Sequence, residues 1–363
     1  MVVVVSCSVL ALLLTYLESA GKMENGMRWG FLLITFLACI HYDYGNDYMS
    51  YYQIFREVEA TPFDIGAVLD GYAFREPGWA LICYLFQPLG GFFVMVAVLS
   101  VIQNAIVYKF IRDNVEPNWR TFSVFIYLFT TNLYLMNFSM MRQGLVICVF
   151  LGLWQYIQEK KWWIPLSVLV LCTFVHSSAI ILLPFAFWGY VRFNNTKIIG
   201  IVLMGLYFAL WFSGDFLNMV FMSTMSIEDV QEYVDTYEKG DATSQFGVGF
   251  FLYQLPFFAT VYYLCANKNS DDGMWKLVSL AAIATLITPF SQIIQLIGRV
   301  AIYFSIYTMA SMPLVYANIT KRTIRVALLL ENVALVLYDY YLFFNNPVWV
   351  DKFSEFHTVF EVL

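Results

Sequence analysis

The arginine Arg142 interrupts an apolar run, LYLMNFSMMRQGLVICVFLGLW (133–154), that is long enough to cross a membrane. A cation in such a run is costly unless it lies near the surface or has a partner. Gln143 and Gly144 follow it and begin a new apolar helix, whose first backbone N–H groups favour anions. The alternative is an arginine that snorkels from a helix end to the interface. We favour the first interpretation, in which Arg142 and Gln143 bind a phosphate group.

A second arginine repeats this pattern. The stretch PFSQIIQLIGRVAIYFSIY (289–307) carries Gln292 and Gln295 one helical turn apart, and Gly298 and Arg299 then begin the next apolar segment. Two arginines at helix starts, each near an amide side chain, indicate a binding site for a polyanion such as a diphosphate.

Two further residues are candidates for proton transfer. Glu76 in FREPGW (74–79) precedes Pro77, which suits the first turn of a helix. Its carboxylate either interacts favourably with the helix dipole or, with a pKa raised at the membrane boundary, serves as a general base. His176 in TFVHSSAIILLP (173–184) lies between two apolar segments. An imidazole can both accept and donate a proton, which suits acid–base chemistry, although a single histidine is more often structural.

A tyrosine-rich stretch, HYDYGNDYMSYYQIF (41–55), contains the turn signal Gly-Asn followed by Asp47. Asp47 is either the N-cap of the next helix or, as a second carboxylate, a third candidate for proton transfer. Tyr48 and Tyr52 share a helical face. They either belong to an aromatic belt at the membrane interface or form a platform on which sugars stack. On the second interpretation, the sugar-binding residues are Tyr48, Tyr52, Gln292 and Gln295. The spacing of Asp43 and Asp47 is a weak metal signal, and we predict neither a metal nor a cofactor.

Composition shows which elements must position these residues. The 363 residues are 60% hydrophobic and 13% charged, whereas soluble domains are about 45–50% apolar and about one quarter charged. Apolar blocks of about 15–21 residues recur, close to the roughly 20 that cross a bilayer core. The sequence therefore predicts an all-α polytopic membrane protein with about twelve transmembrane helices: 2–18, 27–42, 91–111, 121–138, 143–158, 161–176, 177–191, 198–213, 246–266, 276–295, 299–317 and 324–344.

Basic residues give the orientation. One set of connections contains fourteen of the 20 lysines and arginines, so the positive-inside rule makes this set cytoplasmic and places both termini outside. This count puts the candidate residues of five different segments at one outer face: Asp47, Glu76, Arg142, His176 and Arg299.

We expect one integral membrane domain over residues 1–363, with two long external connections. The first, 43–90, contains a short interfacial or re-entrant helix at 77–89, and the second, 214–245, is acidic. The six cysteines lie in apolar segments without CxxC spacing, which favours neither disulfides nor zinc. A net charge of −6 argues against nucleic acid as a partner, and no P-loop, GxSxG or HExxH motif is present.

The segments GNDYMSYY, REPGW, FSMMRQGL, FVHSSAI and GRVAIYF occur in an order and spacing that resemble the EpsG family of Wzy-like exopolysaccharide, capsule and O-antigen polymerases. The resemblance covers roughly residues 30–315. The chain departs from the family pattern at His41, where the family commonly has an arginine.

This resemblance implies a glycosyltransferase with a GT-C-like bundle in the bacterial inner membrane, working without metal at the periplasmic or extracellular face. Such enzymes join oligosaccharide repeat units linked to undecaprenyl diphosphate, by transfer to a sugar hydroxyl of the next unit. Arg142, Arg299 and Gln143 would then bind the diphosphate, while Glu76, His176 or Asp47 would accept the proton. The implied partners are the lipid-linked oligosaccharides, membrane lipid, a chain-length regulator and a flippase.

Three other functions remain open from the sequence. A flippase or transporter for the same lipid-linked units would also need arginines and a polar cavity, but its charges should spread through several spans. A polysaccharide O-acyltransferase would use a membrane histidine such as His176. The last alternative is a scaffold without activity in the same complex.

Overall fold

The computed structural model describes residues 1–64, 66, 76–192, 196–224, 248–266, 274–290 and 295–362. Within these ranges it does not describe the side chains of 212–224, 248–250, 289–290, 295–297 and 299. The chain divides into two compact units: Met1–Val191 with Val336–Leu363, and Arg192–Leu335.

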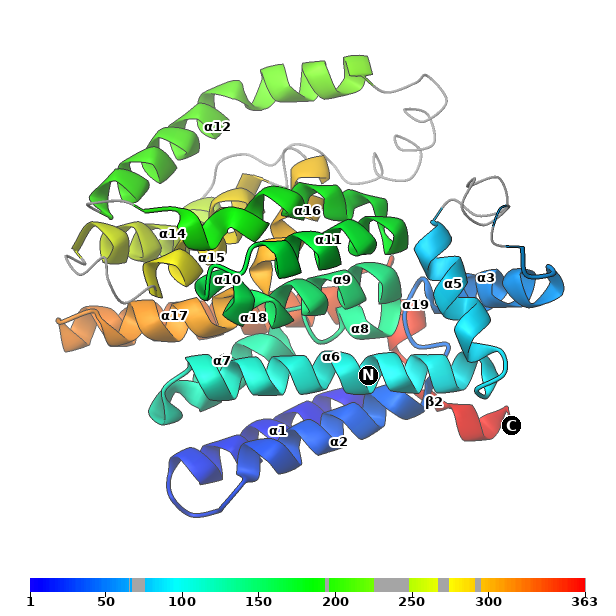
Figure 1. Cartoon of the computed structure of the whole chain (residues 1–363). Helices are drawn as coiled ribbons and strands as arrows, with labels where there is room; N and C mark the ends of the chain where they lie inside the picture. Colours follow the sequence, from blue (N-terminus) through cyan, green and yellow to red (C-terminus); the bar gives the residue numbers. More distant parts are fainter. Residues whose placement is uncertain are drawn as a thin grey trace. The chain divides into compact units, whose positions relative to one another are not determined.

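The first unit is built from helices and one small strand pair (Figure 1). Its elements are α1 (Val2–Ser19), α2 (Gly26–Ile40), β1 (His41–Tyr42), α3 (Tyr48–Ala60), α5 (Pro77–Phe86), α6 (Gly91–Asn114), η1 (Pro117–Trp119), α7 (Arg120–Phe129), α8 (Met136–Ser139), α9 (Met141–Gly152), α10 (Trp154–Gln158), α11 (Trp163–Val175), η2 (Ser177–Tyr190), α19 (Val350–Phe353), β2 (His357–Thr358) and η3 (Val359–Glu361).

In the part of the second unit that the structure describes, all of the secondary-structure elements are helices. They are α12 (Lys197–Thr224), α14 (Val248–Ala266), α15 (Met274–Phe290), α16 (Gln295–Ser305), α17 (Thr308–Ala317) and most of α18 (Arg322–Asn345), whose last residues belong to the first unit.

This architecture confirms an all-α membrane protein. Three of the described helices, α1, α6 and α18, are long and apolar enough to cross a bilayer. Eight further apolar stretches of 10–17 residues are helices or parts of longer helices in the described residues. The number of twelve spans and the GT-C-like arrangement stay predictions. The expected short helix at 77–89 forms as α5.

Several expected spans have different boundaries. The span predicted over 121–138 is helical only to Phe129, where the Thr-Thr-Asn sequence favours a turn and the amide of Tyr134 donates back to the carbonyl of Tyr127. The segment predicted over 177–191 is a 3₁₀ helix with Pro184 inside it. Helix α12 continues to Thr224, so the expected loop 214–245 begins helically, and 225–247 lie outside the described residues.

Close packing of short helices holds the polar segments of the first unit together. Helix α5 packs on α3 and on α11. A Cβ at Gly78 would lie 2.7 Å from the carbonyl carbon of Phe174 and 2.9 Å from the amide of Val175, so α5 and α11 meet backbone to backbone. An aromatic core that includes Tyr51, Trp79 and Phe92 fills the space between α3, α5 and α6.

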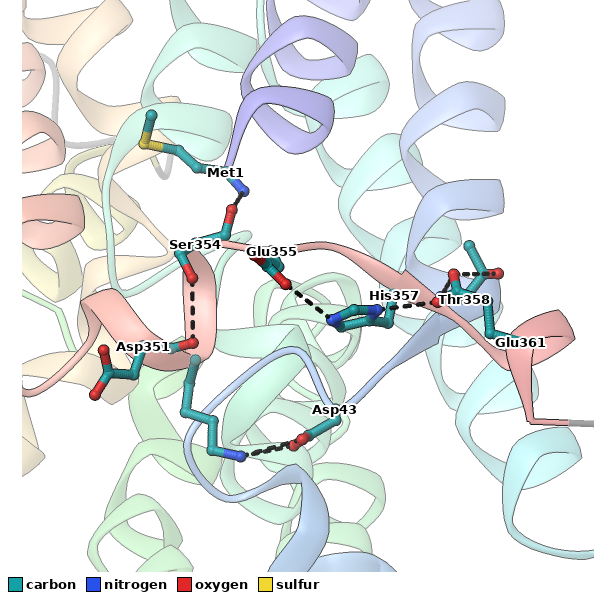
Figure 2. Close-up of polar contacts among 9 residues, drawn as sticks. Met1, Asp43, Asp351, Ser354, Glu355, His357, Thr358 and Glu361 are labelled. Atoms are coloured by element: carbon teal, nitrogen blue, oxygen red, sulfur yellow. Dashed lines mark hydrogen bonds and ion pairs between the residues drawn. The ribbon is translucent and has the colours of Figure 1, made fainter.

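Residues 346–362 lie against the turn between α2 and α3. Strand β1 pairs antiparallel with β2, with His41 opposite Thr358. The amine of Lys352 binds both carboxylate oxygens of Asp43 at 3.0 and 3.1 Å (Figure 2). The carbonyl of Lys352 accepts a hydrogen bond from the amide of Gly45. His357 lies between Glu355 and Glu361. This late segment therefore supports the loop that leads to Asp47.

Candidate active site

The carboxylate of Glu76 is the centre of a polar cluster. Glu76 occupies the N-cap position of α5, ahead of Pro77, and only 8% of its side chain is exposed. One oxygen, Oε1, accepts hydrogen bonds from the Ser177 amide and from Nδ1 of His176, each at 3.0 Å. The other, Oε2, accepts a short hydrogen bond from Nη1 of Arg142. One buried carboxylate thus joins a candidate base to a candidate anion-binding cation.

The backbone around His176 explains how three segments meet. Helix α11 ends at Val175, and His176 has extended dihedral angles before η2 begins at Ser177. The chain therefore turns sharply beside Gly78, where no side chain separates α5 from α11. This contact brings Glu76 to the end of α11, 100 residues away in sequence from His176.

The hydrogen bond to Glu76 fixes the tautomer of His176. An ionised carboxylate only accepts hydrogen bonds, so Nδ1 carries the proton and, in the neutral ring, Nε2 has the lone pair. The imidazole is 25% exposed, and the one contact found for it among the described residues is made by Nδ1, not by Nε2. A lone pair held in this way can accept a proton from a substrate.

Arg142 is the second residue of α9, where the sequence predicted a helix start. Its Nε lies 3.5 Å from the hydroxyl of Tyr51, and its Cζ lies 5.2 Å from the centre of the Tyr51 ring. The nitrogen Nη1 donates to Glu76, whereas Nη2 makes no hydrogen bond with the described residues. The side chain of Arg142 is 27% exposed. One edge of the guanidinium is therefore available to an anion.

Electrostatics favour an ionised Glu76. Burial opposes ionisation of the carboxyl, but hydrogen bonds from His176 and the Ser177 amide, with the charge of Arg142, outweigh it and hold the pKa of Glu76 below its usual value. The sequence left open a base with a raised pKa. The structure instead favours a Glu76 that is ionised at neutral pH, orients His176 and partly neutralises the charge of Arg142.

The other predicted residues lie around this cluster or outside the described part of the chain. Asp47 directly precedes α3, and its backbone amide donates to Ser139. Gln143 is buried in α9. Tyr48 is fully buried and donates to the carbonyl of the buried His41, whereas Tyr52 is half-buried against Phe92 and Phe93. Gln292 and the side chains of Gln295 and Arg299 lie outside the described residues.

A buried network of polar side chains lies behind the start of α9. The amide of Asn137 donates to the hydroxyl of Tyr127, which donates to Asn104 at 2.9 Å. Asn137 also lines a small cavity between α6, α8 and α9, together with Val96, Leu99, Ser100, Gln103 and Met141. This network fixes α8 and the first turn of α9 against α6, and with them the backbone that carries Arg142.

Two participants were not selected as site residues from the sequence: the ring of Tyr51 and the backbone amide of Ser177. The helical spacing of Tyr48, Tyr51 and Tyr52 was a usable signal for Tyr51, but it gave no partner on another helix. No group of three or more His, Cys, Asp or Glu side chains able to hold a metal ion occurs among the described residues.

Fold and site together define a membrane-embedded helical protein with a carboxylate–imidazole–guanidinium cluster. The family comparison is more specific: the EpsG family model matches residues 28–356, so the chain belongs to the EpsG family. Membership indicates a polysaccharide polymerase-like, glycosyltransferase-like function. A search of curated proteins gave no match, and a search of solved structures gave none either.

Proposed function

We propose that this protein polymerises oligosaccharide repeat units linked to undecaprenyl diphosphate, at the outer leaflet of the bacterial inner membrane. The observation that carries the proposal is the shared carboxylate of Glu76, which places Nδ1 of His176 and Nη1 of Arg142 on its two oxygens. Glycosyl transfer from a lipid diphosphate requires a proton acceptor and a stabiliser of negative charge close together. The EpsG family membership supports the same reaction class.

His176 is the proposed general base. Because Glu76 holds the Nδ1 proton, Nε2 accepts the proton from the acceptor sugar hydroxyl as its oxygen attacks the anomeric carbon of the donor. Glu76 stays ionised and stabilises the imidazolium that forms, as the carboxylate does in a hydrolase triad. Its lowered pKa suits this role better than proton transfer.

Arg142 is the proposed group that stabilises the leaving diphosphate. As the bond between the anomeric carbon and the phosphate oxygen breaks, its electron pair stays on that oxygen and negative charge develops there. The free Nη2 edge of Arg142 and the first N–H groups of α9 would bind this charge. The proton on His176 can later pass to the released diphosphate or to solvent.

The remaining predicted residues complete the proposal. Arg299 and Gln143 would assist at the diphosphate, while Tyr52, Gln292 and Gln295 would bind sugars and Asp47 would be a further proton acceptor. Tyr48, which is fully buried, would support this region without contacting the sugar. The proposed partners are the lipid-linked substrates, membrane lipid, a chain-length regulator and the pathway's flippase.

The test uses cells whose own copy of the gene is deleted and replaced by His176→Gln or Arg142→Gln. Removing a general base costs about 10²–10⁴-fold in rate, and removing a charge-stabilising donor costs about 10²–10³-fold. We expect long polymer to disappear in both strains. The matched control is Arg112→Gln, which removes an exposed arginine at the end of α6. Normal chain lengths in both site variants, at normal protein levels, would overturn the proposal.

The leaflet on which single repeat units accumulate separates a polymerase from a flippase. In the deletion strain we expect lipid-linked single repeats on the outer leaflet, where a periplasmic glycosidase can reach them. Accumulation on the inner leaflet would contradict polymerisation and identify a transport function.

A further inference from the structure

We propose that Tyr51, backed by Trp79, is a positioning residue that orients the guanidinium of Arg142 so that its Nη2 edge faces the anion. This inference rests on the proposed function, because it assigns a role to Tyr51 in binding the leaving diphosphate. It is carried by contacts between α3, α5 and α9, which are separate from the Glu76–His176 hydrogen bond.

Tyr51 holds the guanidinium from two directions. The ring lies under Cζ at 5.2 Å, the geometry of a cation–π contact, and the hydroxyl lies 3.5 Å from Nε. Tyr51 is 5% exposed, so its ring is enclosed by protein. The face contact limits tilting of the guanidinium, and the hydroxyl contact limits its rotation in plane.

Trp79 keeps Tyr51 in place. The two rings lie 5.4 Å apart with their planes inclined by 60°, and Trp79 is 1% exposed. Trp79 is three residues after Glu76, on the first turn of α5. The same helical turn therefore supplies the carboxylate that binds Nη1 and the ring that supports Tyr51. Since Nη1 contacts Glu76 and Nε contacts Tyr51, Nη2 is the guanidinium nitrogen without a partner among the described residues.

A neutral aromatic residue suits this position for an electrostatic reason. A long arginine side chain loses rotamer freedom when it is ordered, so a catalytic arginine gains from being held before the substrate arrives. A second carboxylate would hold it equally well, but would cancel the positive charge that the diphosphate needs. Tyr51 restrains the side chain while leaving that charge available.

Two substitutions separate the hydroxyl from the ring. Tyr51→Phe keeps the ring and removes the contact with Nε, and Tyr51→Leu removes both contacts. The matched control is Tyr84→Phe, which deletes the hydroxyl of a tyrosine in the neighbouring helix α5 that donates to the carbonyl of Thr61. All variants are purified in lipid nanodiscs, and inorganic pyrophosphate is the probe of the anion site.

We expect pyrophosphate to bind about 3-fold more weakly to Tyr51→Phe and more than 10-fold more weakly to Tyr51→Leu, by direct titration, with no change in Tyr84→Phe. Polymerisation should fall in the same order. In an Arg142→Lys background the Tyr51→Phe change should add little, because contacting residues are not additive. A purely structural effect would persist in that background.

Failure of this inference differs from failure of the proposed function. If the wild-type protein polymerises and binds pyrophosphate, but Tyr51→Phe and a folded Tyr51→Leu behave like Tyr84→Phe, Tyr51 has no positioning role. Additive effects of Tyr51→Phe and Arg142→Lys would also overturn it. If wild-type protein neither polymerises nor binds pyrophosphate at Arg142, the proposed function itself is wrong.

Discussion

Glu76 accepts three hydrogen bonds with two oxygens, so its charge can be tested separately from its shape. Glu76→Gln preserves the size of the side chain but leaves Arg142 without its counter-ion. We expect polymerisation to fall at least 100-fold, because a neutral amide orients His176 poorly and does not stabilise an imidazolium. The measurement is the initial rate of chain extension by protein in nanodiscs.

The lowered pKa of Glu76 also predicts how acid affects stability. A carboxyl whose pKa is lower in the folded state stabilises the protein above its unfolded pKa, near 4.5, and this contribution is lost as the pH falls through the folded pKa. The thermal midpoint of the wild-type protein should therefore drop as the pH falls below about 4.5. Glu76→Gln should drop less over the same range.

The control for this acid dependence is Glu355→Gln, which changes an 80% exposed side chain. It should follow the wild-type curve. Equal acid sensitivity in Glu76→Gln and the wild type would contradict a depressed pKa at Glu76.

Glu331 presents the opposite situation, a carboxyl without a hydrogen-bond partner in the part of the chain that the structure describes. It lies in α18, and both of its oxygens are enclosed without a hydrogen bond among the described residues. Burying an unsatisfied polar group costs about 1–3 kcal/mol, so Glu331→Gln or Glu331→Leu should raise the thermal midpoint in nanodiscs. Asp351→Asn, at an exposed position, is the comparison. A lower midpoint in both Glu331 variants would show that the carboxyl has a stabilising partner.

At the scale of elements, the contact of α5 with α11 determines whether the site forms. A Cβ at Gly78 would overlap the backbone of Phe174, so Gly78→Ala should push α5 away and lengthen the 3.0 Å contact between Glu76 and His176. We expect a loss of about 1–3 kcal/mol in stability and a larger loss of activity. The readouts are the thermal midpoint and the rate of polymerisation.

Gly205→Ala is the matched control, because it introduces the same methyl group into a helix with nothing within 4 Å. It should be neutral or slightly stabilising, by up to about 1 kcal/mol. If Gly78→Ala behaves like Gly205→Ala, close approach of these helices is not required.

The pairing of β1 with β2 should depend on pH through His357. A hydrogen bond with Glu361, with the charges of Glu361, Glu355 and Asp43, raises the pKa of His357 above its usual value. Its stabilising contribution is therefore complete below about pH 6.5 and is lost as the pH rises through the folded pKa. Hydrogen exchange in residues 354–361, corrected for intrinsic rates, should show less protection at pH 8.5 than at pH 6.

In His357→Gln the protection factors should be low and should not change between these two pH values. A wild-type protein whose protection is constant, or rises with pH, would contradict the ion pair between His357 and Glu361.

At the scale of the whole molecule, the distribution of basic residues predicts the topology. Single cysteines in a cysteine-free background should react with a membrane-impermeant maleimide at Val348, and should not react at Lys160 until the membrane is permeabilised. The six native cysteines are all buried or partly buried, so replacing them with small apolar residues is a mild change. The reverse labelling pattern would invert the orientation and place the Glu76 cluster on the cytoplasmic face.

Sequence patterns predicted the helices well where apolar periodicity decides the structure, as in α2 and α6. They did not predict the end of α7, because the amide of Tyr134 bonds to Tyr127 through a turn rather than through a helix. Topology counting placed Glu76, Arg142 and His176 at one face, and the structure brings these three together. The contact of Tyr51 with Arg142 joins positions 91 residues apart, which no local pattern encodes.

The ion pair of Asp43 with Lys352 has a consequence for biogenesis. It joins positions separated by 309 residues, and the β1–β2 pairing beside it spans a similar interval. During synthesis, the loop before Asp47 and Tyr51 can form these contacts only after almost every later helix has been inserted into the membrane. Contacts of such long range form late in folding. The loop next to the candidate active site is thus completed only after insertion, and we expect nascent chains to stay inactive while they are being made.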